Sequence, residues 1–524
     1  RSRSFGSQIK NAAIMIAQLR KQKSTPIANF RVVHAKLMPV IAERQRLLVI
    51  FRQRLKLAEV INPGGIIQPV QPNRCGRTII PVAQLVSRKG GGIDLLIEPV
   101  IERAVNGGGG IAGHEASSLE QFAAKSERSA SISDATIQQK PQTWIPVMLD
   151  LRNVLSPIET ANGLPNACYV SDDMYQHEQD TLFRNNWAAI GFGKDIAEPG
   201  MVKPVSFLGT PLLLVRTREG RINVFQNVCR HRGMILVDTP QKLRGPITCP
   251  YHSWSYDLDG TLRRTPHIGG PGIDTLDSVQ HCDYPLINVR THVWRDIIFV
   301  NLGDNAPDFE IATDSLLDRW RVFEQPVFHG GADSSITFTL DCNWKLAVEN
   351  YCEAYHLPFI HPALNTYSRL EDHYNILDDG GFAGQGTTVY QPQITDDGRR
   401  FPKFSALPSQ WDKGAEYVAL FPNVLLGVHN DHAFAILLTP DGPGRTIEQV
   451  ELYYADEAAC GSDFADMRAT NTTMWQTVFA EDVGVVEGMQ RGRSASGYDG
   501  GKFSAVMDTP THHFHRWVAT ELIV

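Results

Sequence analysis

Short strand-like runs of hydrophobic residues, separated by turn residues, characterise the middle of the chain. Strands are predicted in five runs, at 202–208, 211–216, 222–226, 247–256 and 297–302. Gly209 and Gly220 lie between the first three runs, where they supply the turn residues that connect short strands. This pattern predicts a small β-rich module.

Toward the C-terminus, strand-like runs mix with hydrophobic patterns of helical period. Strands are predicted at 335–340, 417–428, 432–438 and 446–454, and helices at 172–187, 343–356 and 462–489. A loop of about 35 residues, rich in Gly, Pro and Asp, follows Ile376. Because strands and helices are mixed without strict alternation, the pattern favours an α+β fold over a doubly wound parallel sheet.

Charge divides the chain into two unlike parts. Residues 1–140 contain 21 Lys+Arg and 9 Asp+Glu, a net charge of +12, whereas the remaining residues contain 29 and 48, a net charge of −19. The first part has four aromatic residues and therefore few large anchors for a core. We expect residues 1–147 to be a poorly packed extension without function, upstream of a true start near Met148.

The composition of the whole chain excludes several classes of protein. A net charge of −7 gives no general attraction to nucleic acid or to an anionic membrane. No run reaches the roughly 18 apolar residues that a membrane-spanning helix needs. The eight cysteines are widely spread and no secretory signal opens the sequence, which favours a reducing compartment with metal-bound or free thiols. We expect a cytoplasmic protein.

The strongest chemical signal is a pair of mixed cysteine and histidine motifs. Cys229-x-His231 is followed after 17 residues by Cys249-x-x-His252. Zinc also binds two cysteines and two histidines, but the mixed order within each pair is the Rieske arrangement, in which two thiolates hold one iron of a 2Fe-2S cluster and two imidazoles hold the other. Each half of the motif is expected at a hairpin tip. Such a cluster has a potential of roughly −150 to +300 mV and accepts electrons from a ferredoxin-like donor.

A second metal site is indicated by Glu353, His356 and His361. Glu353 and His356 are three residues apart and would share one face of the predicted helix. Pro358 is expected to end or kink that helix after His356, so that His361 can approach the same point. Two histidines and one carboxylate are the ligands of non-haem Fe(II) oxygenases. Taken alone, the two histidines would more often be ordinary structural residues.

The third ligand can be located by helical periodicity. Asp482 lies on an apolar stripe of the last predicted helix, three or four residues from its neighbours on either side. A lone buried carboxylate is costly unless it is paired or bound to a metal. Glu481 points off the stripe and is the weaker candidate, so the predicted iron ligands are His356, His361 and Asp482.

Taken together, these motifs resemble the Rieske non-haem iron oxygenase α subunits over about residues 160–524. Asn343-Trp344-Lys345, leading into Asn350-Tyr351-x-Glu353-x-Tyr355-His356, belongs to the same resemblance. It implies an all-β Rieske domain at 148–310, with a short N-terminal helix. It also implies a helix-grip catalytic domain, a curved antiparallel sheet with helices, at 311–524. The family further implies a homotrimer and an NAD(P)H-dependent flavin or iron-sulfur reductase as electron donor.

In this family, the cluster of one subunit serves the iron of its neighbour through a carboxylate three residues before the first iron histidine. That position is Glu353 here, with Glu349 one turn earlier as the alternative. Ring-hydroxylating dioxygenases usually have Asp there, and Glu resembles the carnitine and glycine-betaine monooxygenase branch. We therefore expect O₂-dependent hydroxylation or oxidative C–N cleavage of a small methylammonium substrate.

A methylammonium substrate predicts the kind of residues that bind it, and two other functions stay open. A quaternary ammonium would suit an aromatic cage through cation–π contact, and four aromatic residues are candidates for it: Tyr367, Tyr390, Trp411 and Tyr417. An ordinary core role is the alternative for each of them. The alternative functions are an aromatic-ring dihydroxylating dioxygenase and a Rieske protein that only transfers electrons.

Overall fold

The computed structural model describes residues 149–378 and 380–523, and the extension predicted at 1–147 lies outside them. An all-β part contains two antiparallel sheets. The larger has the spatial order β1 (Ala188–Phe192), β10 (Ile297–Asn301), β9 (Asn288–Trp294), β4 (Ile222–Gln226), β3 (Thr210–Arg216), β2 (Met201–Phe207) and β5 (Gln241–Lys242). The smaller consists of β6 (Ile247–Thr248), β7 (Ser255–Tyr256) and β8 (Leu262–Arg264).

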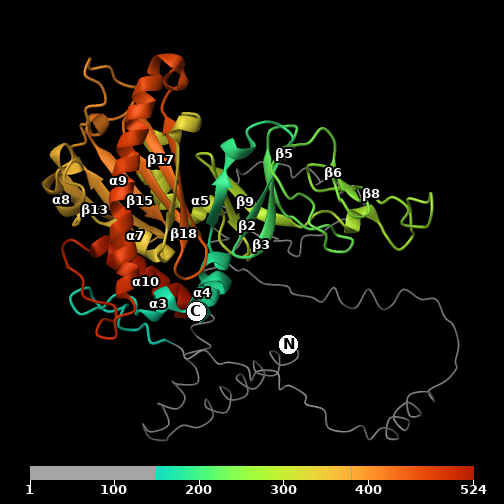
Figure 1. Ribbon diagram of the computed structural model, residues 1–524, viewed down its shortest axis with the longest axis horizontal. Coiled ribbons are helices and arrows are strands. Elements are labelled where there is room, and N and C mark those ends of the chain that lie inside the picture. Colours follow the sequence, from blue (N-terminus) through green and yellow to red (C-terminus); the bar gives the residue numbers. More distant parts are fainter. Residues whose placement is uncertain (1–148, 379, 524) are drawn as a thin grey trace, which may run out of the picture. The chain divides into compact units, whose positions relative to one another are not determined.

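An α+β part is built on an eight-stranded antiparallel sheet. Its order is β11 (Phe328–His329), β18 (Thr446–Tyr454), β17 (His432–Pro440), β16 (Val424–Val428), β15 (Ala415–Leu420), β14 (Phe382–Thr387) and β13 (His373–Leu377), and β12 (Ser335–Leu340) also pairs with β18. The helices are α3 (Ala167–Val170), α4 (Asp172–Glu178), α5 (Phe309–Ala312), α6 (Asp314–Arg319), α7 (Trp344–Cys352), α8 (Leu357–Ile360), α9 (Ala465–Gly492) and α10 (Thr509–Ile523). Figure 1 shows α9 and α7 lying over this sheet. The predicted α+β class is confirmed.

Two predictions about individual elements were wrong. The run 417–428 forms two strands, β15 and β16, and not one. The loop predicted after Ile376 contains β14, a fully buried strand whose glycines hid its pattern. Glycine is required at Gly384, because a Cβ there would overlap the backbone oxygen of Tyr417 on β15.

The helix predicted at 172–187 is confirmed. It consists of α4 and a π-helical turn, and β1 begins directly after it.

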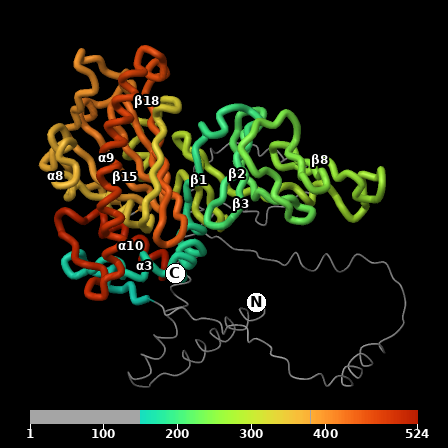
Figure 2. Tube along the Cα trace, viewed as in Figure 1, coloured from blue at the N-terminus to red at the C-terminus, as the bar shows by residue number. Residues whose placement is uncertain are grey.

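The first described segment packs against the C-terminal helix. Figure 2 shows the cyan chain around α3 beside the red helix α10. The backbone N–H of Leu164 donates to His515 Nδ1 on α10 at 2.9 Å. This segment therefore belongs to the core around α7, although α7 comes much later in the chain.

A buried ion pair fixes the start of α7. Lys345 Nζ lies 2.5 Å from Glu178 Oε1 on α4, and both side chains are fully buried. Trp344 Nε1–H donates to the other oxygen of the same carboxylate at 3.0 Å. Asn343 caps the helix by accepting the backbone N–H of Lys345. Each charge therefore depends on its partner, because neither can reach water.

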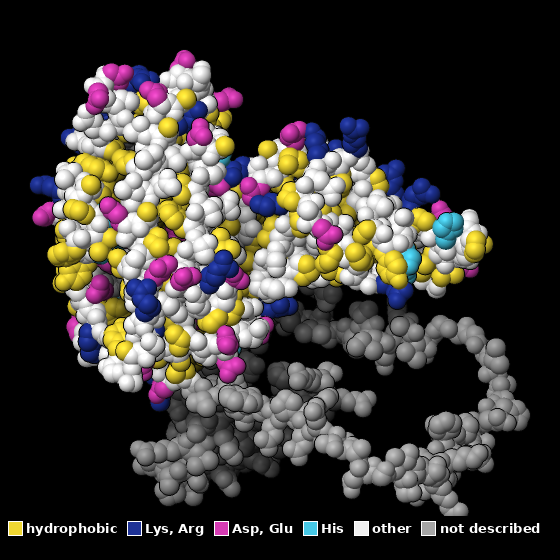
Figure 3. Space-filling model, viewed as in Figure 1, with side chains coloured by type: hydrophobic (Ala, Val, Ile, Leu, Met, Phe, Trp, Pro, Cys, Tyr) yellow, Lys and Arg dark blue, Asp and Glu magenta, His cyan; other side chains and the backbone are white. Residues whose placement is uncertain are grey.

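The described surface carries both signs of charge. Figure 3 shows Lys and Arg side chains interspersed with Asp and Glu over the face that contains α9. Among the residues that the structure describes, no helix combines the length and the hydrophobicity needed to cross a bilayer.

Replacing Lys345 with Met should destabilise the fold by about 3–5 kcal/mol, because it leaves the Glu178 carboxylate buried without its cation. The matched control is Lys242→Met, which breaks an ion pair with Glu198 whose side chains are both more than half exposed. The control should cost less than about 1 kcal/mol. Denaturant unfolding measures both, and equal costs would contradict the assignment.

Candidate functional site

Two loops of equivalent geometry carry the Cys/His motifs. Cys229 and His231 lie after β4, and Cys249 and His252 lie at the tip between β6 and β7. In each loop the cysteine N–H donates to the carbonyl five residues later, at 2.8 Å in both cases, and the cysteine carbonyl accepts an N–H from four residues later. The prediction that each motif lies at a hairpin tip is therefore confirmed. The two loops present their four side chains to each other.

These four side chains suit a 2Fe-2S cluster. Cys229 and Cys249 are buried free thiols, and the rings of His231 and His252 have centroids 4.7 Å apart. The Nδ1 atoms of both histidines are buried and have no hydrogen-bond partner, so iron would satisfy them. Burial raises the pKa of the Cys229 thiol, which must lose its proton when metal binds.

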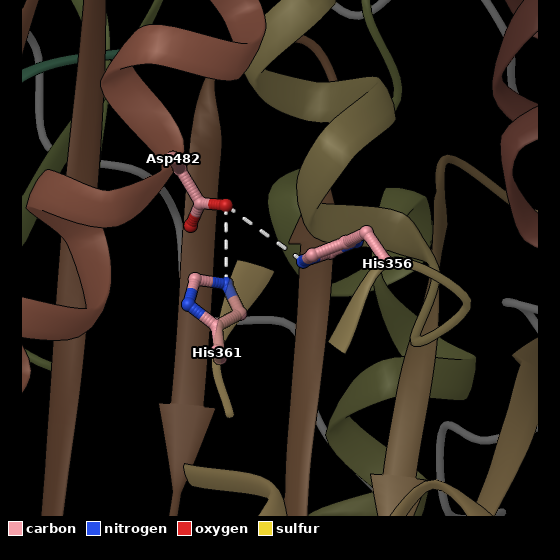
Figure 4. Close-up of side chains that lie close together, drawn as sticks. All are labelled: His356, His361 and Asp482. Carbon is pink, nitrogen blue, oxygen red and sulfur yellow. Dashed lines mark ion pairs between the residues drawn. The ribbon is translucent and has the colours of Figure 1, made fainter. Parts of the chain in front are cut away.

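His356, His361 and Asp482 meet at a second point. The two histidines flank the four-residue helix α8, and Asp482 comes from α9. Asp482 Oδ1 lies 3.1 Å from His361 Nε2 and 3.7 Å from His356 Nε2, as Figure 4 shows. One ligand atom of each residue lies within 4.8 Å of the others. Asp482 Oδ1 is buried without a hydrogen-bond donor, which suits a cation held by all three side chains.

The local backbone around the first histidine differs from the prediction. The helix predicted to reach His356 ends at Cys352, and Glu353 is extended, with φ −127° and ψ 157°. Glu353 and His356 therefore do not share a helical face. The Glu353 carboxylate accepts the backbone N–H groups of Tyr355 and His356, which turns the chain. Pro358 was predicted to end the helix, but it lies in the first turn of α8.

A glutamate supports each iron histidine. His356 Nδ1 donates to Glu353 Oε1 at 2.7 Å, and His361 Nδ1 donates to Glu481 Oε2 at 2.7 Å. Both Nε2 atoms are thereby left for metal. Burial alone would lower the pKa of His361, but the neighbouring carboxylates of Asp482 and Glu481 raise it above its usual range.

The sequence did not reveal the role of Glu481. Its position beside Asp482 on a helix, outside the apolar stripe, was the only signal available. Glu349, the alternative to Glu353, lies elsewhere: Tyr169 Oη–H donates to its carboxylate at 2.5 Å, and His515 Nε2 lies 3.1 Å away. Its contacts are with the core around α3 and α10.

A cavity opens directly onto the triad. It has a volume of about 60 Å³. Five aromatic side chains line it: Tyr351, Tyr417, Phe434, Trp475 and Phe479. On the polar side, His373 Nδ1 donates to Gln385 Oε1 at 2.7 Å, and the Gln385 amide donates to the Glu353 carbonyl at 3.1 Å.

Of the four predicted cage residues, Tyr417 lines this cavity. Trp411 packs edge-on against Phe323 in the core. Tyr390 is buried and stacks nearly parallel to Trp475 at a centroid distance of 5.9 Å, and Tyr367 contacts Tyr390. Trp475, which was not among the predicted cage residues, forms part of the cavity wall.

Two protein families match the chain. The Rieske [2Fe-2S] domain family matches residues 186–280, and the family described as ring hydroxylating alpha subunit (catalytic domain) matches residues 317–522. The predicted pairing of a Rieske domain with such a catalytic domain is confirmed. Both predicted cofactors, a 2Fe-2S cluster and a mononuclear iron, are those of the matched domains.

Several characterised proteins are similar in sequence. The chloroplastic choline monooxygenase of Arabidopsis thaliana is 27% identical over 381 residues, which cover 68% of this chain and 82% of that protein. The carnitine monooxygenase oxygenase subunit of Escherichia coli K12 is 25% identical, covering 68% and 92%. The putrescine 2-hydroxylase of Ralstonia nicotianae is 27% identical, covering 71% and 98%.

Solved structures show the same fold. The quaternary ammonium Rieske monooxygenase CntA superimposes with a TM-score of 0.58 at 21% identity, covering 71% of this chain and 98% of that one. Naphthalene 1,2-dioxygenase from Rhodococcus sp. also gives a TM-score of 0.58, at 16% identity, covering 71% and 96%.

Replacing His252 with Ala should abolish the visible and paramagnetic spectrum of a Rieske cluster, because nitrogen ligation gives that spectrum its character. Iron content should fall from about three atoms per chain to about one. The control is His281→Ala in the same part of the chain, whose imidazole bonds to Thr265 and which should keep the spectrum. A normal spectrum in the His252 variant would remove it from the ligand set.

Replacing Glu481 with Leu should weaken iron binding by about 10–100-fold, since His361 loses the carboxylate that orients it. Glu481→Gln keeps an acceptor for Nδ1–H and should lose less. Glu487→Gln on the same helix is the control, because Glu487 accepts the backbone N–H of Asp341. Iron titration of the three variants gives the result, and full affinity in the Leu variant would contradict it.

Proposed function

The chain belongs to the Rieske non-haem iron oxygenase α subunits, and on that premise we propose that it oxygenates a small methylammonium compound. In the overall reaction, one oxygen atom of O₂ enters a C–H bond beside the ammonium nitrogen and the other leaves as water. Two electrons and two protons are consumed. Where the hydroxylated carbon bears the nitrogen, the product breaks down to an amine and a carbonyl compound.

The aromatic cavity beside the triad carries this proposal. Tyr417, Trp475 and Phe434 line it together with the iron histidines. Aromatic faces attract a quaternary ammonium by about 0.5–2 kcal/mol, and most strongly where water is excluded. The similarity to choline and carnitine monooxygenases supports the same substrate class.

The residues of the chain bind, orient and exclude water. We assign Cys229, His231, Cys249 and His252 as cluster ligands, and His356, His361 and Asp482 as iron ligands. When bound, the cluster supplies single electrons and the mononuclear iron supplies a site for dioxygen. Glu353 and Glu481 keep the Nδ1 protons in place and fix the ring orientations. The apolar wall excludes water from the substrate.

We further propose a homotrimer in the cytoplasm that takes electrons from an NAD(P)H-dependent flavin or iron-sulfur reductase. The proposed domains are 148–310 for the cluster and 311–524 for the iron. Exposed hydrophobic side chains support contact between subunits, because large exposed apolar residues often mark interfaces. Tyr355 and Phe359, which are 48% and 74% exposed, lie close to Glu353 in sequence. Tyr251, 55% exposed, contacts the ring of His252.

The function is tested with the complete enzyme, a reductase and a panel of choline, carnitine, glycine betaine, putrescine, benzoate and naphthalene. We expect oxygen uptake coupled to product formation with a methylammonium compound. Coupled turnover of the aromatic compounds alone would establish a ring dioxygenase instead. Cluster reduction without oxygen uptake on any compound would favour an electron carrier.

If electrons pass from the cluster of one subunit to the iron of its neighbour, two inactive variants should restore activity to each other in mixed oligomers. A chain with His252→Ala lacks a working cluster, and a chain with Glu353→Gln keeps both metal sites but loses the carboxylate charge. Each homo-oligomer should be nearly inactive. Mixed oligomers of the two should regain measurable turnover, because an intact cluster then faces an intact iron site on the neighbouring copy. Mixed oligomers as inactive as the parents would argue for transfer within one chain.

A further inference from the structure

The indole of Trp475 is held from behind by a histidine and a carboxylate, His432 and Asp431. Trp475 Nε1–H donates to His432 Nε2 at 3.0 Å, and His432 Nδ1 lies 2.6 Å from Asp431 Oδ1. The Trp475 and His432 side chains are 2% and 1% exposed. Asp431 lines a separate polar cavity of about 380 Å³. The three residues thus connect the wall of the iron cavity to a second cavity.

These distances fix the protonation state of His432. An indole N–H is a donor only, so Nε2 must carry a lone pair. The remaining proton is therefore on Nδ1, where it donates to the Asp431 carboxylate. A carboxylate on Nδ1 selects one tautomer and one ring orientation of a histidine. Asp431 thereby keeps His432 as an acceptor for the indole.

A buried indole N–H does not need a histidine backed by a carboxylate as its hydrogen-bond acceptor. Trp187 in the same chain is also buried, and its indole N–H donates to the backbone carbonyl of Pro307 at 2.9 Å. Trp475 instead uses a buried imidazole backed by a carboxylate, although burying polar groups is costly. Trp475, unlike Trp187, faces the cavity at the iron triad.

Neighbouring rings restrict the indole, and the hydrogen bond sets the direction of its N–H. Tyr390 and Phe479 lie nearly parallel to Trp475, with interplanar angles of 14° and 19°, and Phe434 lies at 58° with a centroid distance of 4.7 Å. Ring contacts do not distinguish the two edges of an indole, whereas a hydrogen bond acts along one direction. The bond to His432 therefore determines which edge of the indole faces the cavity.

We propose that Asp431 and His432 are positioning residues that fix Trp475 as the cation-selective wall of the substrate cavity. This inference rests on the proposed methylammonium function. It adds a specificity determinant outside the metal ligands and the glutamates that support them. Asp431 and His432 act through the indole and do not line the substrate cavity themselves.

The test measures selectivity for charge at constant shape. The probes are choline and 3,3-dimethylbutan-1-ol, which replaces the quaternary nitrogen with carbon. Calorimetry on the metal-loaded enzyme gives the ratio of their dissociation constants. His432→Leu should lower the preference for choline at least about fivefold, because the indole loses the bond that fixes its orientation. His432→Gln offers an amide oxygen to the indole and should restore most of it.

Asp431 provides a second route that leaves His432 in place. Asp431→Ala frees the imidazole proton to move to Nε2 and should lower the preference, whereas Asp431→Asn keeps an acceptor and should retain it. Asp412→Asn is the control, because Asp412 lines the same polar cavity but pairs with Lys403. In a Trp475→Phe background, His432→Leu should cause no additional loss, since both changes remove the same bond.

The outcomes separate this inference from the function on which it rests. A wild-type enzyme that does not prefer choline overturns the methylammonium function and the cation-selective wall together. A wild-type preference that survives both His432→Leu and Asp431→Ala overturns the positioning role alone. An additional loss in the Trp475→Phe background also overturns it, because His432 would then act by another route. Iron and cluster contents confirm that each variant is folded.

Discussion

The buried ion pair between Lys345 and Glu178 determines where the catalytic helix begins, and the active site follows from that position. Both charges are fully buried, so neither tolerates displacement of the other. Nine residues of α7 then lead to Glu353, and its carboxylate turns the chain so that His356 faces α9. The geometry of the iron site thus depends on a contact with α4, more than 160 residues earlier in the chain.

The meeting of the three proposed iron ligands could be predicted from sequence because their spacing reflects chemistry as well as local structure. His356, His361 and Asp482 do come together, although the helical argument for His356 was wrong. Helical periodicity assumes that the helix continues, and Glu353 ends it by binding the N–H groups of Tyr355 and His356. A carboxylate near a helix end competes with backbone carbonyls for the backbone N–H groups. Helical periodicity does not take that competition into account.

Side chains that act through long-range contacts could not be predicted. Glu481 meets His361 across 120 residues and Trp475 meets His432 across 43. Helical periodicity places Trp475 on a buried stripe, but a stripe facing a packed sheet and a stripe facing a cavity have the same pattern. β14 was missed for the opposite reason, because its glycines are typical of a loop. Gly384 allows close packing on β15, and Gly386 allows close packing of Tyr374 on β13.

The two pairs of histidines are oriented in opposite ways, and this distinguishes the two metal sites. At the triad, glutamates bind the Nδ1 atoms of His356 and His361, and both Nε2 atoms face Asp482. A carboxylate on Nδ1 makes the imidazole a stronger ligand, which suits a single iron with open positions. At the cluster loops, the Nδ1 atoms of His231 and His252 are buried and unpaired. Without a carboxylate behind them, these imidazoles stay weak and neutral donors, which is the condition for a high cluster potential.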